Sequence, residues 1–188
     1  MKLVLIRHGE TKANDEKKVQ GWTDNPLNET GILQAKRIRS FYETVNKRFD
    51  VVISSPLSRA YETATIALGY QRDLNIMIDY HFLERDFGVF EHRIASEVLP
   101  IILEKNFTYR GYEDDKMLLR RVENGLIALY DKYPHKEVVI FCHSHVIKSF
   151  LILADKKYDY KAFIDNGSIH TLSYDGERLN VLEFNKTV

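Results

Sequence analysis

The chain has 188 residues, a length that fits one domain. Its 27 basic and 27 acidic side chains cancel, which argues against a protein that coats nucleic acid or an anionic membrane. The single cysteine, Cys142, excludes an intramolecular disulfide, and no apolar run is long enough for a membrane span or a secretory signal. We therefore expect a cytoplasmic protein that binds neither nucleic acid nor membrane.

Two short apolar runs in the first third of the chain, residues 3–6 and 51–53, are typical of strands that are buried on both faces. Between them, Asn28 is a suitable N-cap, and apolar residues then recur at helical spacing. A strand, a helix and a second strand in this order indicate the start of a layered α/β fold.

A further helix is predicted directly after the second strand. Ser55 is a suitable N-cap, and Pro56 suits the first helical position. The helix should run through Ile66 and stop near Gly69. Its positive end would then lie beside an anion bound at the end of the strand.

The second half of the chain continues the alternation after one irregular part. Residues 76–78 are a weak strand candidate, and residues 82–111 are rich in aromatic side chains without a regular pattern. A helix is predicted over 114–132, then a buried strand over 138–141 and a helix over 145–154.

The C-terminal part is predicted to be a β-hairpin that turns at Asp175 and Gly176. All-apolar strands that alternate with helices indicate an α/β fold with a mostly parallel sheet, to which the hairpin adds an antiparallel strand. No repeat, linker or low-complexity tract divides the sequence, so we expect one domain over residues 1–188.

Polar side chains follow three of the predicted strands. Arg7 and His8 follow the first, Arg59 lies shortly after the second, and His143 follows the strand at 138–141. Because ligands bind at the carboxyl ends of parallel strands, we expect these side chains to converge. Guanidinium groups match phosphate oxygens in pairs, and an unprotonated imidazole can attack phosphorus. The sequence thus predicts a phosphate site, where Gly9 would let backbone amides approach the anion.

A phosphate ester that is cleaved at such a site releases an alkoxide, which needs a proton. Glu84, in the run Leu-Glu-Arg-Asp, is the candidate donor. Taken alone, a carboxylate beside other charged residues more often belongs to a solvated surface, so this assignment depends on the wider pattern.

The wider pattern consists of four blocks that resemble the histidine phosphatase superfamily, in its phosphoglycerate-mutase-like branch. The blocks are Arg-His-Gly-Glu-Thr at 7–11, Ser-Ser-Pro-Leu-Ser-Arg-Ala at 54–60, Leu-Glu at 83–84, and the histidine at 143. Other matching residues extend the resemblance from residue 3 to about residue 174. The candidate reactive residues occur in the family's order, and this order identifies the family far more specifically than the first tripeptide alone.

The resemblance implies a three-layer α/β/α sandwich with a mostly parallel six-stranded sheet, an antiparallel edge strand and a small lid insert at about 85–115. It implies a reaction without metal or cofactor, in which His8 takes the phosphoryl group and Glu84 donates and then accepts a proton. The implied catalytic residues are His8, Glu84, Arg7, Arg59 and His143, and the implied substrate-binding residues are Asn14, Gln20, Gly21 and Ser144.

The chain departs from the family at a few positions. Ser144 and His92 each stand where the family often has glycine, and a side chain at 144 would narrow the pocket or add a hydrogen bond. The basic residues of the short insert alternate with acids, and Arg120 and Arg121 are interpreted as the polar face of a helix. This favours a phosphatase acting on a small phosphorylated metabolite. We expect a monomer or a homodimer. The alternatives are a phosphoglycerate mutase and a catalytically silent binding domain.

Two other chemistries fit the sequence less well. His143 and His145 would supply half of a zinc site, but no acidic or cysteine partner is placed near them in the sequence. Cys142 would suit a thiol phosphatase only with an arginine six residues further on, and Lys148 stands there. His145 is interpreted as a pocket residue or the start of a helix.

Overall fold

The computed structural model describes residues 1–71 and 73–188, and it contains one six-stranded sheet in the order β3-β2-β4-β1-β5-β6. Strands β1 to β4 run parallel, whereas β5 pairs antiparallel with both β1 and β6. The predicted strands and the closing hairpin are confirmed. The strands are β1 (Lys2–Arg7), β2 (Val51–Ser54), β3 (Ile76–Ile78), β4 (Glu137–Cys142), β5 (Ile169–Tyr174) and β6 (Leu179–Lys186).

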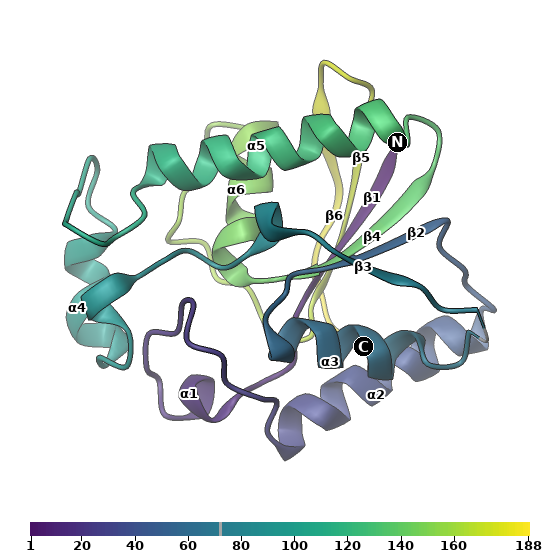
Figure 1. Ribbon diagram of the computed structural model, residues 1–188, viewed down its shortest axis with the longest axis horizontal. Coiled ribbons are helices and arrows are strands. Elements are labelled where there is room, and N and C mark those ends of the chain that lie inside the picture. Colours follow the sequence, from purple (N-terminus) through teal and green to yellow (C-terminus); the bar gives the residue numbers. More distant parts are fainter. Residues whose placement is uncertain (72) are drawn as a thin grey trace.

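Helices cover both faces of the sheet, which confirms the three-layer sandwich (Figure 1). Helices α2 (Glu29–Thr44) and α3 (Ser58–Leu68) lie on one face. Helices α5 (Asp115–Lys132) and α6 (Ser144–Ala154) lie on the other. The N-caps Asn28 of α2 and Asp114 of α5 each accept hydrogen bonds from the first turn of their helix.

The all-apolar strands are explained by these two helical layers. Successive side chains of a strand point to opposite faces, so both sets must be apolar when both faces are covered. In β1, Leu3 and Leu5 pack with α5 and α6, whereas Val4 and Ile6 pack with α2 and α3. The sheet is therefore buried on both sides at its centre, and polar groups gather at the strand ends.

The start of α3 differs from the prediction. The helix begins at Ser58, its N-cap is Leu57, and Ser55 and Pro56 precede it. The carboxylate of Asp24 accepts hydrogen bonds from the Ser58 amide (2.8 Å) and hydroxyl (2.7 Å), which satisfies this helix end from a distant loop. Its end at Gly69 is as predicted. The helix terminus thus already has an anion of its own, and from this terminus the Ser55 hydroxyl accepts only a long hydrogen bond, from the Leu57 amide (3.4 Å).

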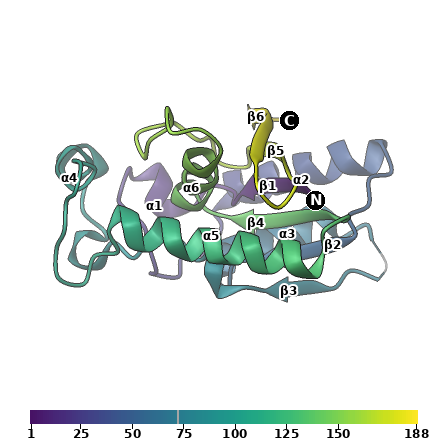
Figure 2. The ribbon, with the colours of Figure 1, turned by 90° about the horizontal axis from the view of Figure 1, so that it is seen from above.

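The irregular stretch at 82–111 contains one helix that the sequence did not reveal, α4 (Ala95–Ile102). It has a proline inside it and no side-chain cap, so its sequence lacks the usual start signal. Short helical turns η1 (Tyr80–Phe82) and η2 (Gly88–Phe90) precede it. The segment packs its aromatic residues in a third small core and lies, with the short helix α1 (Lys12–Asp15), at one end of the molecule (Figure 2).

This end of the molecule lies beyond the carboxyl ends of the parallel strands (Figure 1). The segment is held to the loop after α1 by backbone hydrogen bonds of 2.8 Å from Val19 to Arg93, from His92 to Val19 and from Ala95 to Lys17. That it acts as a lid stays a prediction.

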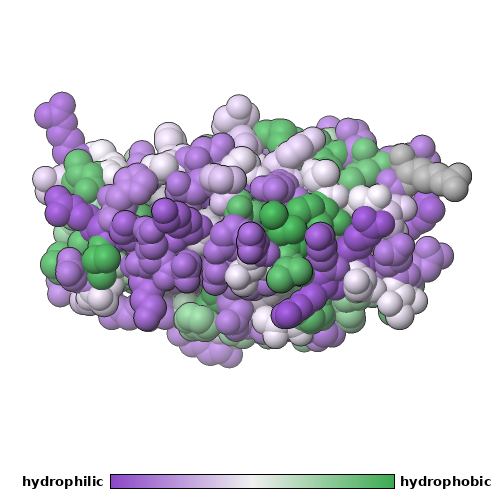
Figure 3. Space-filling view, turned by 90° about the horizontal axis from the view of Figure 1, so that it is seen from below, coloured by the Kyte–Doolittle hydropathy of each residue, from purple (hydrophilic) through white to green (hydrophobic). Residues whose placement is uncertain are grey.

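The outward side of α2 and α3 is mostly hydrophilic, with an apolar patch near the middle of the view (Figure 3). The exposed apolar side chains of α2 and its C-cap include Leu33 and Val45. Among the described residues, no helix combines the length and the apolar character that a membrane crossing requires.

Gly125 lies on the buried face of α5, against η1. A Cβ atom at this position would lie 2.6 Å from the Cβ of His81 and 3.0 Å from Phe82 Cζ. Alanine normally stabilises a helix interior by about 0.5–1 kcal/mol relative to glycine, but overpacking of this kind costs about 1–3 kcal/mol. We expect Gly125→Ala to lower the free energy of unfolding in urea, whereas Asn124→Ala, on the exposed side of α5, should leave it equal or higher. A Gly125→Ala protein as stable as wild type would contradict the tight contact.

Candidate active site

A pocket of about 590 Å³ opens at the carboxyl ends of the parallel strands. Its wall includes the carboxyl end of β1, the first turns of α6 and the loops after α1 and α6. Ala95 and Leu99 of α4 also contribute to it. Three predicted site residues, Gly21, Arg59 and His143, are buried and do not line it. The other six predicted site residues line this one pocket: Arg7, His8, Asn14, Gln20, Glu84 and Ser144.

His8 is buried at the end of β1. Its Nδ1 lies 2.7 Å from the carbonyl oxygen of Gly9. A carbonyl oxygen can only accept, so Nδ1 carries the proton and the lone pair of the neutral ring is on Nε2. Burial and the nearby Arg59 and Arg7 guanidinium groups hold the pKa of His8 well below its usual value. The imidazole is therefore neutral at pH 7 and has a free nucleophilic nitrogen.

Gly9 has a different role from the one expected. Its amide donates to the hydroxyl of Thr63 (3.0 Å), so it is not free for an anion. A Cβ atom at Gly9 would lie only 2.4 Å from the carbonyl oxygen of Gly31 in α2. Close packing of two backbone segments explains this glycine.

The two predicted phosphate-binding arginines are both held by backbone carbonyls. One terminal nitrogen of Arg7 donates to Ile164, and the two of Arg59 donate to Thr23 (3.0 Å) and Gly21 (2.7 Å). Among the described residues, the buried Nε atoms of both arginines have no hydrogen-bond partner. Burial lowers the pKa of each to about 10, so both stay charged at neutral pH. Both guanidinium groups are thus fixed in position beside His8.

His143 is the residue before α6, and its ring centroid lies 5.2 Å from that of His8. Its Nε2 is 2.7 Å from the hydroxyl of Ser55, the residue that the sequence had suggested as a helix cap. Burial and the Arg59 guanidinium lower its pKa well below the usual value. The buried Nδ1 has no hydrogen-bond partner in the part of the chain that the structure describes.

Glu84 follows η1, and its side chain is buried at the pocket wall. Its Oε1 accepts hydrogen bonds from the backbone amides of Arg85 (2.9 Å) and His145 (3.2 Å). The second of these amides belongs to the first turn of α6, so this helix start is directed at a carboxyl group. Burial raises the pKa of Glu84, which favours its protonated form and suits a proton donor.

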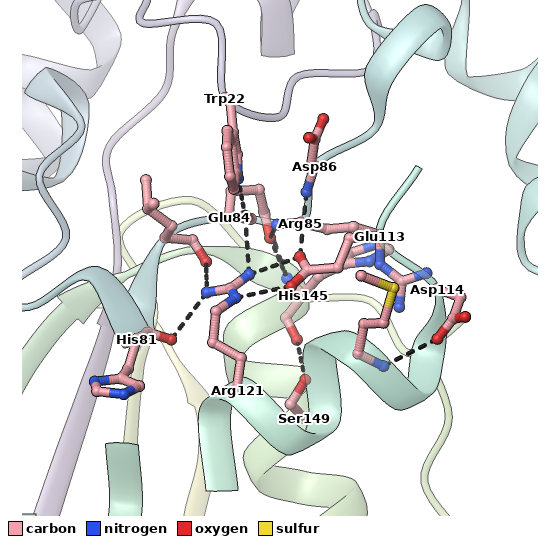
Figure 4. Close-up of polar contacts among 12 residues, drawn as sticks. Trp22, His81, Glu84, Arg85, Asp86, Glu113, Asp114, Arg121, His145 and Ser149 are labelled. Atoms are coloured by element: carbon pink, nitrogen blue, oxygen red, sulfur yellow. Dashed lines mark hydrogen bonds and ion pairs between the residues drawn. The ribbon is translucent and has the colours of Figure 1, made fainter. Parts of the chain in front are cut away.

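Arg121 holds the segment that carries Glu84, a role that the sequence did not reveal (Figure 4). Its guanidinium donates to the carbonyls of His81 (2.9 Å), Leu83 (2.9 Å) and Glu84 (3.2 Å). It also pairs with both carboxylate oxygens of Glu113, at 2.8 and 2.7 Å. The interpretation of Arg121 as part of a solvated face is therefore wrong, because these bonds tie η1 to α5.

The loop that contains Gly21 is fixed from the other side. The Trp22 indole donates to the carbonyl of Glu84 (2.8 Å), and the Glu91 carboxylate accepts from the amides of Trp22 (2.8 Å) and Thr23 (2.9 Å). A Cβ atom at Gly21 would lie 2.5 Å from Glu91 Oε1. Gly21 therefore contributes its carbonyl to Arg59 and close packing to this loop.

The polar residues at the mouth of the pocket are partly engaged with one another. Asn14 Oδ1 accepts from the side chain of Asn166 (3.2 Å), and Gln20 Oε1 accepts from Thr11 (3.0 Å) and Asn25 (2.8 Å). Ser144, the first residue of α6, lines the pocket. Substrate contacts by Asn14, Gln20 and Ser144 stay predictions.

The residues considered for a zinc site and for a thiol phosphatase have other surroundings. His143 contacts Ser55, whereas the His145 ring stacks on Tyr160 at 5.4 Å. Among the described residues, no three His, Cys, Asp or Glu side chains are grouped in a way that would hold a metal ion. Burial raises the pKa of the Cys142 thiol, which opposes its ionisation to a nucleophile.

Known proteins are similar to this chain in sequence and in fold. The chain is 35% identical over 147 residues to the uncharacterized phosphatase PhoE of Bacillus subtilis, covering 78% of this chain and 74% of PhoE. It is 30% identical over 192 residues to phosphoglycerate mutase-like protein 4 of Arabidopsis thaliana, covering 95% and 82%. The structure of phosphoserine phosphatase from Entamoeba histolytica in complex with 3-phosphoglyceric acid has a TM-score of 0.82 and 27% identity, covering 99% and 97%.

The expected family is confirmed by the extent of these matches. Residues 3–187, nearly the whole chain, match the family description, and the six-stranded sheet has the arrangement of the solved relatives. This protein belongs to the histidine phosphatase superfamily, branch 1.

Proposed function

We propose that this enzyme is a phosphatase that hydrolyses small phosphate monoesters through a phosphohistidine on His8, without a metal ion. The observation that carries the proposal is that three of the five buried nitrogens without partners among the described residues belong to the groups around His8, Arg7 Nε, Arg59 Nε and His143 Nδ1, the other two being Arg85 Nε and His145 Nδ1. Buried polar groups are nearly always hydrogen-bonded, so such a group beside a neutral imidazole suits an anionic ligand. The phosphatase relatives agree with this reading.

In the first step, His8 Nε2 attacks phosphorus and the ester P–O bond breaks. Glu84 donates its proton to the leaving oxygen, and the arginines stabilise the charge on the phosphoryl oxygens. In the second step, water attacks the phosphohistidine while Glu84 takes back a proton. The products are the alcohol, orthophosphate and the original enzyme.

The metal-free mechanism predicts that chelation leaves the activity intact. The protein should hydrolyse p-nitrophenyl phosphate at the same rate in excess EDTA as in buffer with added Mg²⁺ or Zn²⁺, because the positive charge at the site comes from guanidinium groups. The measurement is the initial rate of nitrophenol release after extended dialysis against EDTA. A rate that falls on chelation and returns with one metal would overturn this part of the proposal.

A phosphoglycerate mutase is the second candidate, and the similarity to a mutase-like plant protein favours keeping it. A mutase must retain the bisphosphate intermediate and keep water out, and the resemblance implies that extra basic residues of a longer insert do this in the mutases. Two of the arginines that the insert and α5 supply are already paired, Arg85 with Asp115 (2.7 Å) and Arg121 with Glu113 (2.7 Å). Orthophosphate rather than 2-phosphoglycerate is therefore the expected product from 3-phosphoglycerate with a trace of the 2,3-bisphosphate.

A further inference from the structure

Lys148 is a buried cation in the wall of the active-site pocket. It lies on α6 four residues after Ser144, so both side chains lie on one face of the helix and both line the pocket. Its exposed fraction is only 8%. Lysine is almost never buried to this extent unless its charge is paired. Its burial on α6 therefore calls for an explanation.

The protein itself satisfies only part of this ammonium group. Lys148 Nζ donates to the backbone carbonyl of Tyr160 at 3.0 Å, which uses one of three donors. No carboxylate forms an ion pair with it in residues 1–71 and 73–188. Burial lowers the pKa of Lys148 to about 8, and the charge of Glu84 opposes this shift. The group is thus still mostly protonated at pH 7 and has donors left for a ligand.

Lys148 lies near the reacting groups, since the charges of both Glu84 and Arg7 act on it. Glu84, whose proton goes to the leaving oxygen, interacts electrostatically with Lys148 and lines the same pocket. His145, between Ser144 and Lys148 on α6, is kept neutral because burial and the Lys148 charge lower its pKa. Because Arg7 and Arg59 already serve the transferred phosphoryl group, we assign an anion bound by Lys148 to the part of the substrate that departs.

The whole pocket has more positive than negative side chains. Its side-chain carboxylates are Glu10, Glu84 and Asp165, of which Glu10 accepts from the Asn28 amide and Asp165 from the Asn185 amide. The basic residues that line it are Arg7, Lys17, Lys18, Arg37 and Lys148, of which Lys18 is paired with Glu16 at 2.7 Å. Among the described residues, five basic side chains thus face three carboxylates around the pocket. One phosphate group does not fill about 590 Å³, a size that suits a complete small ligand.

We propose that Lys148 binds a second anionic group on the leaving part of the substrate, so that the preferred substrates are phosphate monoesters that also carry a carboxylate or a second phosphate close to the ester. This inference rests on the proposed phosphatase function. It assigns Lys148 to specificity for the departing group, whereas Arg7 and Arg59 act on the transferred phosphoryl group.

The test uses two pairs of esters that differ in one anionic group. The first pair is 3-phosphoglycerate and glycerol 3-phosphate, and the second is 1,3-propanediol bisphosphate and propyl phosphate. A hydrogen bond to a charged group corresponds to about a 10- to 100-fold difference in kcat/KM. We expect the wild-type enzyme to prefer the more charged member of at least one pair by such a factor. The pair that shows the preference distinguishes a carboxylate from a phosphate.

Three variants then assign the preference to one side chain. Lys148→Met keeps an unbranched side chain of similar length and should reduce the preference to about one, mainly through KM, whereas Lys148→Arg should retain much of it. Lys161→Met, which removes an exposed charge from the nearby loop, should leave the preference at its wild-type value.

Two results would overturn the inference, and both can be read separately from the phosphatase proposal. One is a wild-type ratio near one for both pairs, which needs no variant to fold. The other is a ratio that persists in Lys148→Met. If p-nitrophenyl phosphate is hydrolysed through a trapped phosphohistidine while either result is found, the phosphatase stands and the Lys148 subsite falls. If wild type forms no phosphohistidine, the proposed function itself fails.

Discussion

His8→Ala should abolish turnover, with a loss of about 10⁴-fold or more in kcat on every ester, because the nucleophile is removed. Two other histidines near the pocket are already engaged. His143 and His145 are both buried, His143 pairs with Ser55, and His145 packs on Tyr160. The neutral Nε2 of His8 is the nitrogen that the geometry leaves free.

The measurement combines two readouts. Nitrophenol release gives the rate, and rapid quenching after incubation with a ³²P-labelled ester gives the phosphoprotein. A phosphohistidine is labile in acid and stable in alkali, so this pattern should be found in wild type and vanish in His8→Ala. His135→Ala is the matched control, since His135 is exposed, and it should behave as wild type. Labelled protein that persists in His8→Ala would move the nucleophile to another residue.

Glu84→Gln should slow alkyl phosphates by about 10²–10⁴-fold and p-nitrophenyl phosphate far less. An alkoxide is a poor leaving group that needs a proton as the P–O bond breaks, whereas nitrophenolate departs without one. Glutamine preserves the local structure, because its carbonyl can still accept from the amides of Arg85 and His145. The change therefore removes the proton and little else.

The pH dependence gives an independent check on Glu84. Since burial raises its pKa, the proton donor survives to higher pH than an exposed glutamate would. Phosphorylation of His8 by an alkyl ester should slow as pH rises through this raised pKa, and that limb should disappear in Glu84→Gln. Single-turnover rates measure this step, with Glu97→Gln on the exposed side of α4 as the control. Equal losses on both ester types, or an unchanged pH profile, would contradict the assigned role.

The layered fold could be predicted because its signals are local. A strand that is covered on both faces must be apolar throughout, and residues 3–6, 51–53 and 138–141 meet this condition. The helix starts at Asn28 and Asp114 carry side chains that cap their own first turns. The start of α3 differs from the prediction because the carboxylate that accepts from its first amide, Asp24, comes from a loop 34 residues earlier.

The residues that hold the site in place could not be predicted, because their partners are also distant in the sequence. Arg121 lies on a helix whose exposed face is rich in charged residues, and only the fold brings it to the carbonyls of His81, Leu83 and Glu84. Lys148 follows an apolar strand and the helix start, and only packing of the 155–168 loop buries it. The position of a charged residue along a helix does not show whether its side chain meets water or a distant segment of the chain.

The sequence by itself determined the family, the order of layers and the residues expected to act on phosphate, because the strands and the motifs at their ends are contiguous. Tertiary structure alone decided the state of these groups. It left Nε2 of His8 free, buried Glu84 so that its pKa rises, and enclosed Lys148 without a carboxylate partner among the described residues. Protonation and charge pairing depend on burial and on neighbours distant in sequence, and these exist only once the chain is folded.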